Sequence, residues 1–136
     1  MTNTKIKFPV LLIRENDKFL YGIKTDLGII SKGGETFYKK KRIEIYDSEG
    51  NHFELKKAEL NGKANWKISL KYFQQMYEMK LLFEKKSKIE LNQLKGEIIN
   101  HMKKYKKHWL NIGTLDGLTK MVNNENSYSE LIKKLK

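Results

Sequence analysis

The chain contains no cysteine, and this absence excludes a disulfide framework, a thiolate nucleophile and any metal site built from thiolate ligands. Proline occurs once, at Pro9, and no low-complexity tract or internal repeat marks a linker. The apolar run from Phe8 to Ile13 is too short to cross a membrane and lacks a small-residue cleavage site. We therefore expect a single compact domain over residues 1–136 that is cytoplasmic and has no membrane partner.

Arginine is also scarce, although the chain is strongly basic with a formal net charge of +12. Of the 28 Lys and Arg residues, only Arg14 and Arg42 are arginines. Proteins that read phosphates and bases favour arginine for its bidentate guanidinium group. A chain rich in lysine, asparagine and isoleucine is typical of an AT-rich bacterial genome. The excess of lysine, which is concentrated in the C-terminal half, therefore predicts attraction to polyanions without indicating a selected nucleic-acid function.

The first half of the chain predicts antiparallel β-strands. Apolar runs at residues 9–14 and 18–24 are separated by a polar Glu-Asn-Asp segment, which indicates a hairpin. Residues 42–47 alternate, with Ile43 and Ile45 on one face. A tight Ser-Glu-Gly-Asn connection leads to a further strand at residues 52–60.

Two later stretches of the sequence are harder to assign. Residues 66–72 (WKISLKY) alternate without error, which predicts a strand with Trp66 in the core. Residues 74–86 fit the period of a strand and also that of a helix, because their apolar residues alternate and also form a helical stripe. We interpret this second stretch as a strand.

The last third of the chain predicts helices. One apolar stripe at helical spacing comprises Leu91, Leu94, Ile98, Met102 and Tyr105. Thr114 can cap the next helix, and Ser127 with Glu130 forms a capping box that opens the last one. The order of elements predicts an α+β fold, with an N-terminal antiparallel β-meander at about residues 5–85 and C-terminal helices at about residues 90–136 packed on the sheet.

The motifs of the common catalytic and metal-binding sites are absent. The three histidines, His52, His101 and His108, form no HxH or HExxH motif, so the sequence predicts no metal site. No GxSxG elbow occurs, and the Gly33-Gly34 pair lacks the lysine of a phosphate-binding loop. We therefore expect a protein that is not an enzyme and that needs no cofactor.

One enzyme alternative remains open. Asp47 followed by Glu54 and Lys56 resembles the catalytic core of the restriction-endonuclease-like nucleases. That resemblance implies two carboxylates that hold Mg²⁺ and a lysine that positions the attacking water. Glu54 and Lys56 share a strand face, whereas Asp47 lies at the turn.

Two basic stretches interleave cations with aromatic residues, at 37–42 (FYKKKR) and 103–109 (KKYKKHW). Such stretches occur in single-strand nucleic-acid binders, and weak non-specific binding to nucleic acid is expected from charge alone. The helical stripe assigns Tyr105 to the core, and Trp109 is expected to join it as a core anchor. A nucleic-acid-binding domain is therefore an alternative function.

Residues 43–55 (IEIYDSEGNHFEL), 79–102 and 128–136 (YSELIKKLK) together resemble small single-domain immunity proteins of bacterial polymorphic and contact-dependent toxin systems. The resemblance rests on a turn with a D-x-x-G pattern and on C-terminal amphipathic helices. It implies tight one-to-one binding that neutralises a cognate toxin. Because this chain is so basic, we expect that toxin to present an acidic surface.

The contact residues are predicted separately from that resemblance, as exposed aromatic and charged groups near loops. The first set lies beside Gly33 and Gly34 and comprises Phe37, Tyr38 and Arg42. The second is the basic face formed by Lys103, Lys104, Lys106 and Lys107.

Overall fold

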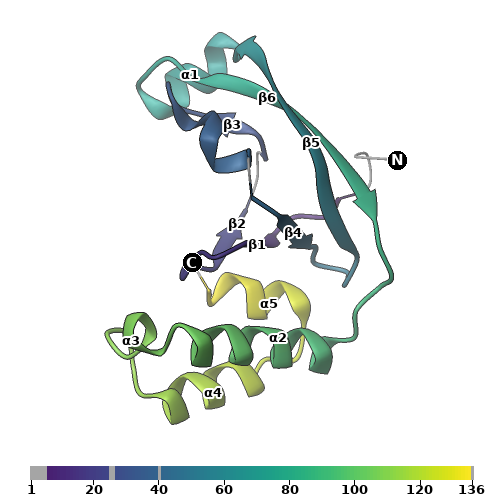
Figure 1. Cartoon of the computed structure of the whole chain (residues 1–136), viewed down its shortest axis with the longest axis vertical. Helices are drawn as coiled ribbons and strands as arrows, with labels where there is room; N and C mark the ends of the chain where they lie inside the picture. The colour runs from purple at the N-terminus through teal and green to yellow at the C-terminus, as the bar shows by residue number, and fades with distance from the viewer. Residues whose placement is uncertain (1–5, 25–26, 40, 136) are drawn as a thin grey trace.

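A computed structural model of the chain describes residues 6–24, 27–39 and 41–135. It shows an antiparallel sheet of six strands in the N-terminal part, followed by helices, so the predicted α+β fold class is confirmed (Figure 1). The strands are β1 (Val10–Arg14), β2 (Tyr21–Ile23), β3 (Ile29–Ile30), β4 (Ile43–Tyr46), β5 (His52–Lys63) and β6 (Tyr77–Lys85). The helices are the 3-10 helix η1 (Gly34–Tyr38) and the α-helices α1 (Trp66–Tyr72), α2 (Leu91–Lys104), α3 (Lys106–Trp109), α4 (Leu115–Asn123) and α5 (Tyr128–Lys133).

The strand order across the sheet is β2-β1-β4-β5-β6-β3. The expected β1–β2 and β4–β5 pairs are both present as antiparallel hairpins. The chain then departs from a simple meander, because β3 crosses to the far edge and pairs with β6, and η1 brings it back to β4 beside β1. The long β5–β6 hairpin curls over the rest of the sheet (Figure 1).

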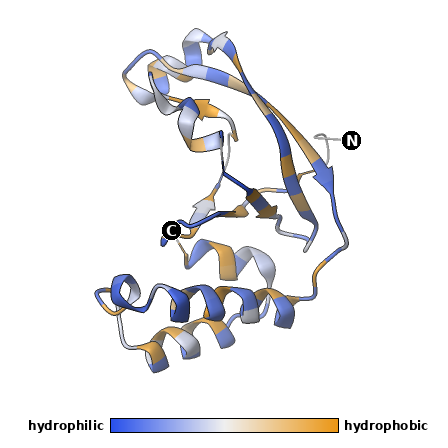
Figure 2. Ribbon diagram, viewed as in Figure 1, coloured by the Kyte–Doolittle hydropathy of each residue, from blue (hydrophilic) through white to orange (hydrophobic). Residues whose placement is uncertain are grey.

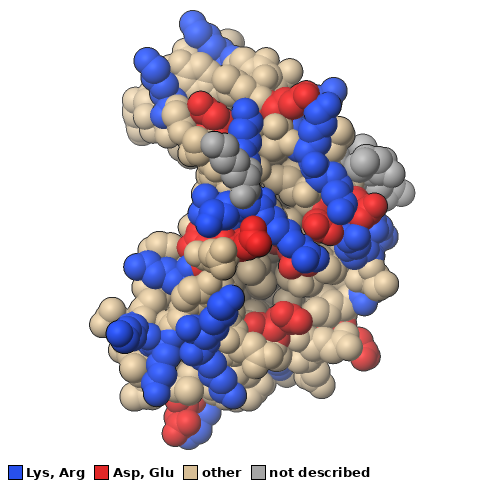
Figure 3. Space-filling view, viewed as in Figure 1, with Lys and Arg blue, Asp and Glu red and all other residues tan. Residues whose placement is uncertain are grey.

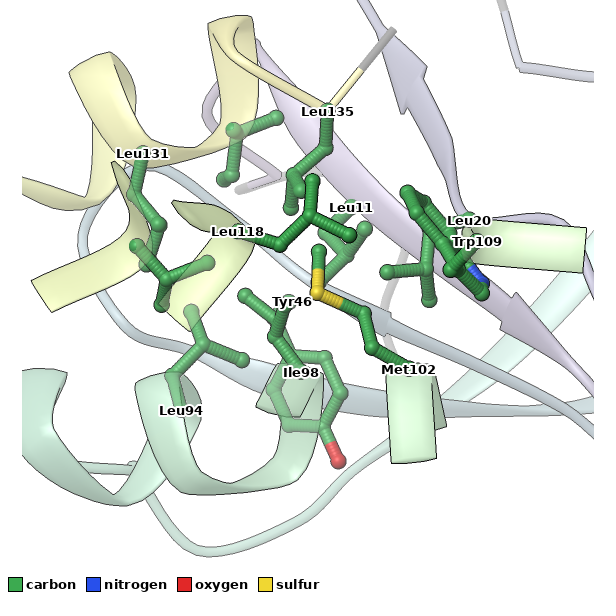
Figure 4. Close-up of a cluster of buried hydrophobic side chains, with 12 residues drawn as sticks. Leu11, Leu20, Tyr46, Leu94, Ile98, Met102, Trp109, Leu118, Leu131 and Leu135 are labelled. Carbon is green, nitrogen blue, oxygen red and sulfur yellow. The ribbon is translucent and has the colours of Figure 1, made fainter. Parts of the chain in front are cut away.

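Helices α2 to α5 pack on one face of the sheet around a first hydrophobic core. The predicted stripe of α2 supplies Leu94, Ile98 and Met102, all fully buried. They pack with residues of α4 and α5 against Leu11 and Tyr46 of the sheet (Figure 4). Burial of such a side chain contributes about 1.5–3 kcal/mol, so this core stabilises the attachment of the helical layer. Hydrophilic and hydrophobic residues alternate along α2 and α4 (Figure 2), as expected of helices with one buried face.

A second hydrophobic core fills the inside of the curled sheet. It contains Leu12, Ile45, Phe53 and Phe83, with η1 among the segments that cover it. Leu11 and Leu12 belong to different cores because successive side chains of a strand point to opposite faces. Strand β1 is therefore buried on both sides.

The prediction of a strand at residues 66–72 is wrong, because this segment forms helix α1 at the tip of the β5–β6 hairpin. Asn65 caps the helix by accepting a hydrogen bond from the main-chain N–H of Lys67 at 2.9 Å. Phe73 ends it in the left-handed conformation with φ 58°. Trp66 is 68% exposed and is not a core residue. The interpretation of residues 74–86 as a strand is confirmed by β6.

The predicted cap at Thr114 is present, and so is the Ser127 half of the predicted capping box. Thr114 accepts a hydrogen bond from Gly117 N–H at 3.0 Å, and Ser127 accepts one from Glu130 N–H at 3.1 Å. Trp109 is buried as expected, with 7% of its surface exposed. In the described residues, no helix combines the length and the apolar character needed to cross a membrane.

Candidate functional site

The chain bends at Tyr105, between helices α2 and α3. Tyr105 has φ −111° and ψ 44°, which stops α2 at Lys104 and lets α3 start at Lys106 in a new direction. The last turn of α2 carries His101, Lys103 and Lys104, where cations suit the negative end of the helix dipole. The bend places Lys104, which precedes Tyr105, and Lys106 and Lys107, which follow it, around one hollow.

The β1–β2 turn is fixed against this bend by its main chain. The carbonyl oxygen of Lys18 accepts hydrogen bonds from Trp109 Nε1 at 3.0 Å and from His101 Nε2 at 3.1 Å. Beside it, the carboxylate of Asp17 accepts hydrogen bonds from the Phe19 N–H and from the Tyr21 hydroxyl. The side chain of Lys18 is thereby positioned beside α3, far from it in the sequence.

The same hydrogen bonds keep the side chain of Asp17 ionised. Burial alone would raise the pKa of Asp17, but hydrogen bonds from Tyr21, from the Phe19 N–H and from Arg14 hold it below its ordinary value. The buried Asp17 is therefore a carboxylate, and Arg14 lies 3.3 Å from it. The contacts of the Asp17 carboxylate lie within the turn, with Arg14, Phe19 and Tyr21. It forms no ion pair with the lysines of α3.

The hollow at the α2–α3 bend is an open pocket of about 630 Å³, here named the cationic pocket. Its lining comprises Lys18, Lys104, Lys106 and Lys107, together with Tyr105, His108 and Asn111. No carboxylate lines it, and within residues 6–24, 27–39 and 41–135 none of these four lysines forms an ion pair. Lysines gather over this end of the molecule (Figure 3, lower left). The pocket is suited to anionic groups.

A smaller hollow of about 310 Å³, named the side pocket, continues from the cationic pocket because Lys104 and Tyr105 line both. Arg14 and Arg42 line it, and Glu44 contributes a carboxylate. The side pocket therefore has mixed charge, whereas no carboxylate lines the cationic pocket.

Aromatic rings lie next to the lysines of the cationic pocket. Phe19 is 44% exposed and meets the His108 ring edge to face, with 4.8 Å between the ring centroids. The ammonium of Lys18 lies 5.4 Å from the centroid of the Phe19 ring, and that of Lys104 lies 5.4 Å from the centroid of Tyr105. A bound group thus meets cations and ring faces together.

The structure brings most of the second predicted contact set to the cationic pocket. Lys104, Lys106 and Lys107 line it, whereas Lys103 is exposed on α2 outside the lining. Arg42, from the first set, lines the side pocket and has a side chain that is 60% exposed. The two predicted sets are therefore linked through Lys104, which lines both hollows.

The two aromatic residues of the first set are not exposed anchors, and this expectation is corrected. Tyr38 is only 8% exposed, and its hydroxyl accepts a hydrogen bond from Gly28 N–H at 3.2 Å inside the second core. Phe37 is half-buried, with its ring 5.1 Å from the Tyr21 ring and 4.9 Å from the Arg14 guanidinium. Helix η1 turns both rings inward.

Sequence reasoning missed three residues that line the cationic pocket: Lys18, His108 and Asn111. Lys18 comes from the β1–β2 turn, and the long-range hydrogen bonds of its carbonyl oxygen with Trp109 and His101 bring it to the pocket. His108 lies within the basic stretch 103–109 but is not among the predicted contact residues. No local pattern of the sequence marks these residues as neighbours.

The carboxylates of the nuclease alternative are engaged in structural contacts. Asp47 is fully buried and accepts hydrogen bonds from the main-chain N–H groups of Lys7, Glu49 and Asn51. Glu54 lies 3.3 Å from both Arg42 and Lys56. The strand register pairs Glu54 with Glu44, about 10 Å along the strand from Asp47. Within the described part of the chain, no three His, Cys, Asp or Glu residues are grouped to hold a metal ion.

Comparison of the chain with protein-family models, with curated proteins and with solved structures finds no match.

Proposed function

We propose that this protein is a binding protein that captures an acidic protein partner in its cationic pocket, as an immunity protein that neutralises a bacterial toxin by one-to-one binding. One observation carries the proposal. Four lysines from two distant segments converge on a pocket of about 630 Å³ that no carboxylate lines. Such a concentration of positive charge is maintained against mutual repulsion, which an anionic partner would relieve.

The chemistry of the pocket favours a protein surface rich in Asp and Glu. Lysine ammonium groups are mobile point charges that can adapt to carboxylates in several positions, whereas the planar guanidinium of arginine would hold one bidentate group in a fixed geometry. The open form of the pocket admits a loop or a helix end of a partner. Complementary charge also raises the association rate of two proteins. A high association rate suits an immunity protein, because it must bind its toxin before the toxin acts.

The proposal is tested with Lys104→Glu/Lys107→Glu, which reverses two charges inside the pocket. The matched control is Lys103→Glu/Lys120→Glu, which makes the same change of net charge at exposed positions outside the lining. The partner is the purified toxin domain encoded next to this chain's gene. We expect the pocket variant to lose at least about tenfold in affinity and to stop protecting cells, whereas the control keeps both.

An absent neighbouring toxin gene, or equal affinity of both variants for its product, would count against the immunity function. Circular dichroism of the two variants must match that of the wild type, because all four positions are exposed on helices. A steep fall of the association rate with ionic strength, present in the wild type and reduced in the pocket variant, would locate the effect in the pocket.

A second candidate function is single-stranded nucleic-acid binding, and the exposed Phe19 ring beside Lys18 and His108 favours it. Single-strand binders combine such cations with rings on which bases stack. The probe is a fluorescent oligothymidylate, titrated at several salt concentrations against the wild type and Phe19→Ala. Submicromolar affinity at about physiological ionic strength that Phe19→Ala reduces would support this function, and a collapse of binding at that salt would dismiss it.

A further inference from the structure

His108 differs from the other two histidines of the chain in its contacts. The ring Nε2 of His52 pairs with the Glu44 carboxylate at 2.9 Å, and that of His101 pairs with the Lys18 carbonyl oxygen at 3.1 Å. Among the described residues, no hydrogen bond or ion pair reaches the ring nitrogens of His108. Because His108 lines the cationic pocket, its imidazole is open to a group that binds there.

Two aromatic neighbours hold the His108 ring at the wall of the pocket. Its centroid lies 4.8 Å from that of Phe19 and 5.4 Å from that of Trp109, and both contacts are edge to face. Trp109 is buried and bonded to the β1–β2 turn. These contacts restrict the rotation of the half-buried imidazole, which lowers the entropy lost when a ligand binds.

The charged groups that face His108 are cations. The other residues that line the cationic pocket are Lys18 of the β1–β2 turn, Lys104 of α2, Tyr105 at the bend, Lys106 and Lys107 of α3, and Asn111. Outside the lining, His101 of α2 lies within electrostatic range of His108. The Asp17 carboxylate of the β1–β2 turn accepts its hydrogen bonds from within that turn. An imidazolium at His108 would therefore add a fifth positive charge to a pocket that no carboxylate lines.

We propose that His108 is a binding residue of the cationic pocket and takes up a proton when a carboxylate-bearing segment of the partner binds. The inference rests on the proposed function, because it takes the bound group to be a protein segment rich in Asp and Glu. A neutral imidazole has one N–H donor, whereas an imidazolium has two. A carboxylate only accepts hydrogen bonds, and its negative charge favours the imidazolium. The proton comes from solvent and forms the second N–H bond of the ring.

Proton uptake makes capture of the partner dependent on pH. By linkage, binding favours protonation of His108 by the same factor by which protonation favours binding. Affinity therefore rises as the pH falls through the range in which histidine titrates, and it stops rising once the ring is also charged in the free protein. The partner is held more tightly in a mildly acidic than in a weakly alkaline medium.

The experiment uses the full chain and a hexaglutamate peptide blocked at both ends, with hexaglutamine as the uncharged control. Nuclear magnetic resonance follows the ring protons of the three histidines from pH 8 to pH 6. We expect hexaglutamate to raise the titration midpoint of His108 by about half a pH unit or more, and hexaglutamine to leave it unchanged. The rise should disappear in Lys104→Glu/Lys107→Glu and persist in Lys103→Glu/Lys120→Glu.

The affinity for hexaglutamate is measured at both ends of this pH range. It should be about two- to threefold higher at pH 6 than at pH 8 in the wild type, because half a pH unit of linkage corresponds to about threefold. His108→Gln should abolish this ratio. The matched control His52→Gln, at a ring that lies outside the lining and bonds to Glu44, should keep it.

A His108 midpoint that hexaglutamate leaves unchanged, or a pH dependence that His108→Gln retains, would overturn the inference. A midpoint that rises with oligothymidylate and not with hexaglutamate would overturn it in favour of a nucleic-acid ligand. Proton uptake at His108 in the absence of any cognate toxin supports the inference and counts against the immunity function alone. Toxin capture that does not depend on pH would overturn the inference and leave the immunity function intact.

Discussion

The indole Nε1 of Trp109 donates a hydrogen bond to the main-chain carbonyl oxygen of Lys18 at 3.0 Å, across 91 residues of sequence. The same carbonyl oxygen also accepts from His101. This contact joins the β1–β2 turn to the helical layer and so assembles the cationic pocket from two distant segments. The pocket and the stability of the helical layer are therefore coupled.

The two tryptophans should behave in opposite ways. Trp109→Phe loses the hydrogen bond to Lys18 and part of a packed core, and should lower the free energy of unfolding by about 1–2 kcal/mol. Trp66→Phe changes an exposed side chain and should alter it by less than about 0.5 kcal/mol. Urea unfolding followed by circular dichroism measures both. The emission maximum should shift to the blue in Trp66→Phe and to the red in Trp109→Phe, and equal maxima would contradict the assignment.

His101 should give the protein a sensitivity to mild acid. Burial lowers the pKa of its imidazole below the ordinary 6.5, partly opposed by its hydrogen bond to the Lys18 carbonyl oxygen. The unfolded chain then binds the proton more readily, so the stabilisation is present above pH 6.5 and is lost as the pH falls through the lower folded-state value.

The matched variant for this test is His101→Gln, which keeps an N–H donor for the Lys18 carbonyl oxygen but does not titrate. Urea midpoints are compared from pH 7.5 down to pH 5. The wild type should lose more stability than the variant over this range, and parallel curves would contradict the role given to His101.

Asp47 should be a structural residue. Asp47→Ala leaves buried main-chain N–H groups of the β4–β5 turn without an acceptor, and should destabilise the fold by about 3 kcal/mol or more. Glu49→Ala, at an exposed position of the same turn, is the control and should change stability by less than about 0.5 kcal/mol. Thermal unfolding distinguishes them. A stable Asp47→Ala variant would reopen the nuclease alternative, whose direct test is Mg²⁺-dependent nuclease activity in the wild type and Glu54→Ala.

Gly50 should not tolerate a side chain. It has φ +82°, and an added Cβ would lie 2.6 Å from the Tyr128 ring and 2.8 Å from the Ile89 carbonyl oxygen. Gly50→Ala should therefore destabilise by about 2–4 kcal/mol through backbone strain and overlap. Gly33→Ala is the control with the same φ of +82° but open space around it, and should show the strain alone, about 1–2 kcal/mol. Equal losses in the two variants would show that the contact with Tyr128 is unimportant.

The helical layer could be predicted from the sequence because its signals are local. The stripe of α2 continues over several turns, and the caps at Thr114 and Ser127 act within three residues. The spacing of apolar residues could not decide between strand and helix for residues 66–72. A segment of seven residues is short enough to fit a strand or two turns of helix equally well. The cap at Asn65 and the left-handed residue Phe73 decided the outcome.

The candidate site was only partly predictable for a different reason. The lysines at 104, 106 and 107 are visible as a basic stretch, whereas Lys18 is brought to them by long-range hydrogen bonds with Trp109 and His101. Tyr38 looked like an exposed anchor because its partner, the Gly28 N–H, lies ten residues away in an irregular segment. Contacts between distant or irregular segments leave no period in the sequence, so these side chains could not be placed from it.

The burial of β1 on both faces has a consequence for synthesis. Leu11 packs in the same core as Leu131 and Leu135, so strand β1 and helix α5 bury apolar side chains against the same cluster. On the ribosome, the Leu11 face of β1 lacks the part of its cover that α5 supplies until residues 128–135 have emerged. We expect the nascent chain to keep part of this apolar face exposed until α5 has emerged, which makes it a client for chaperones during that time.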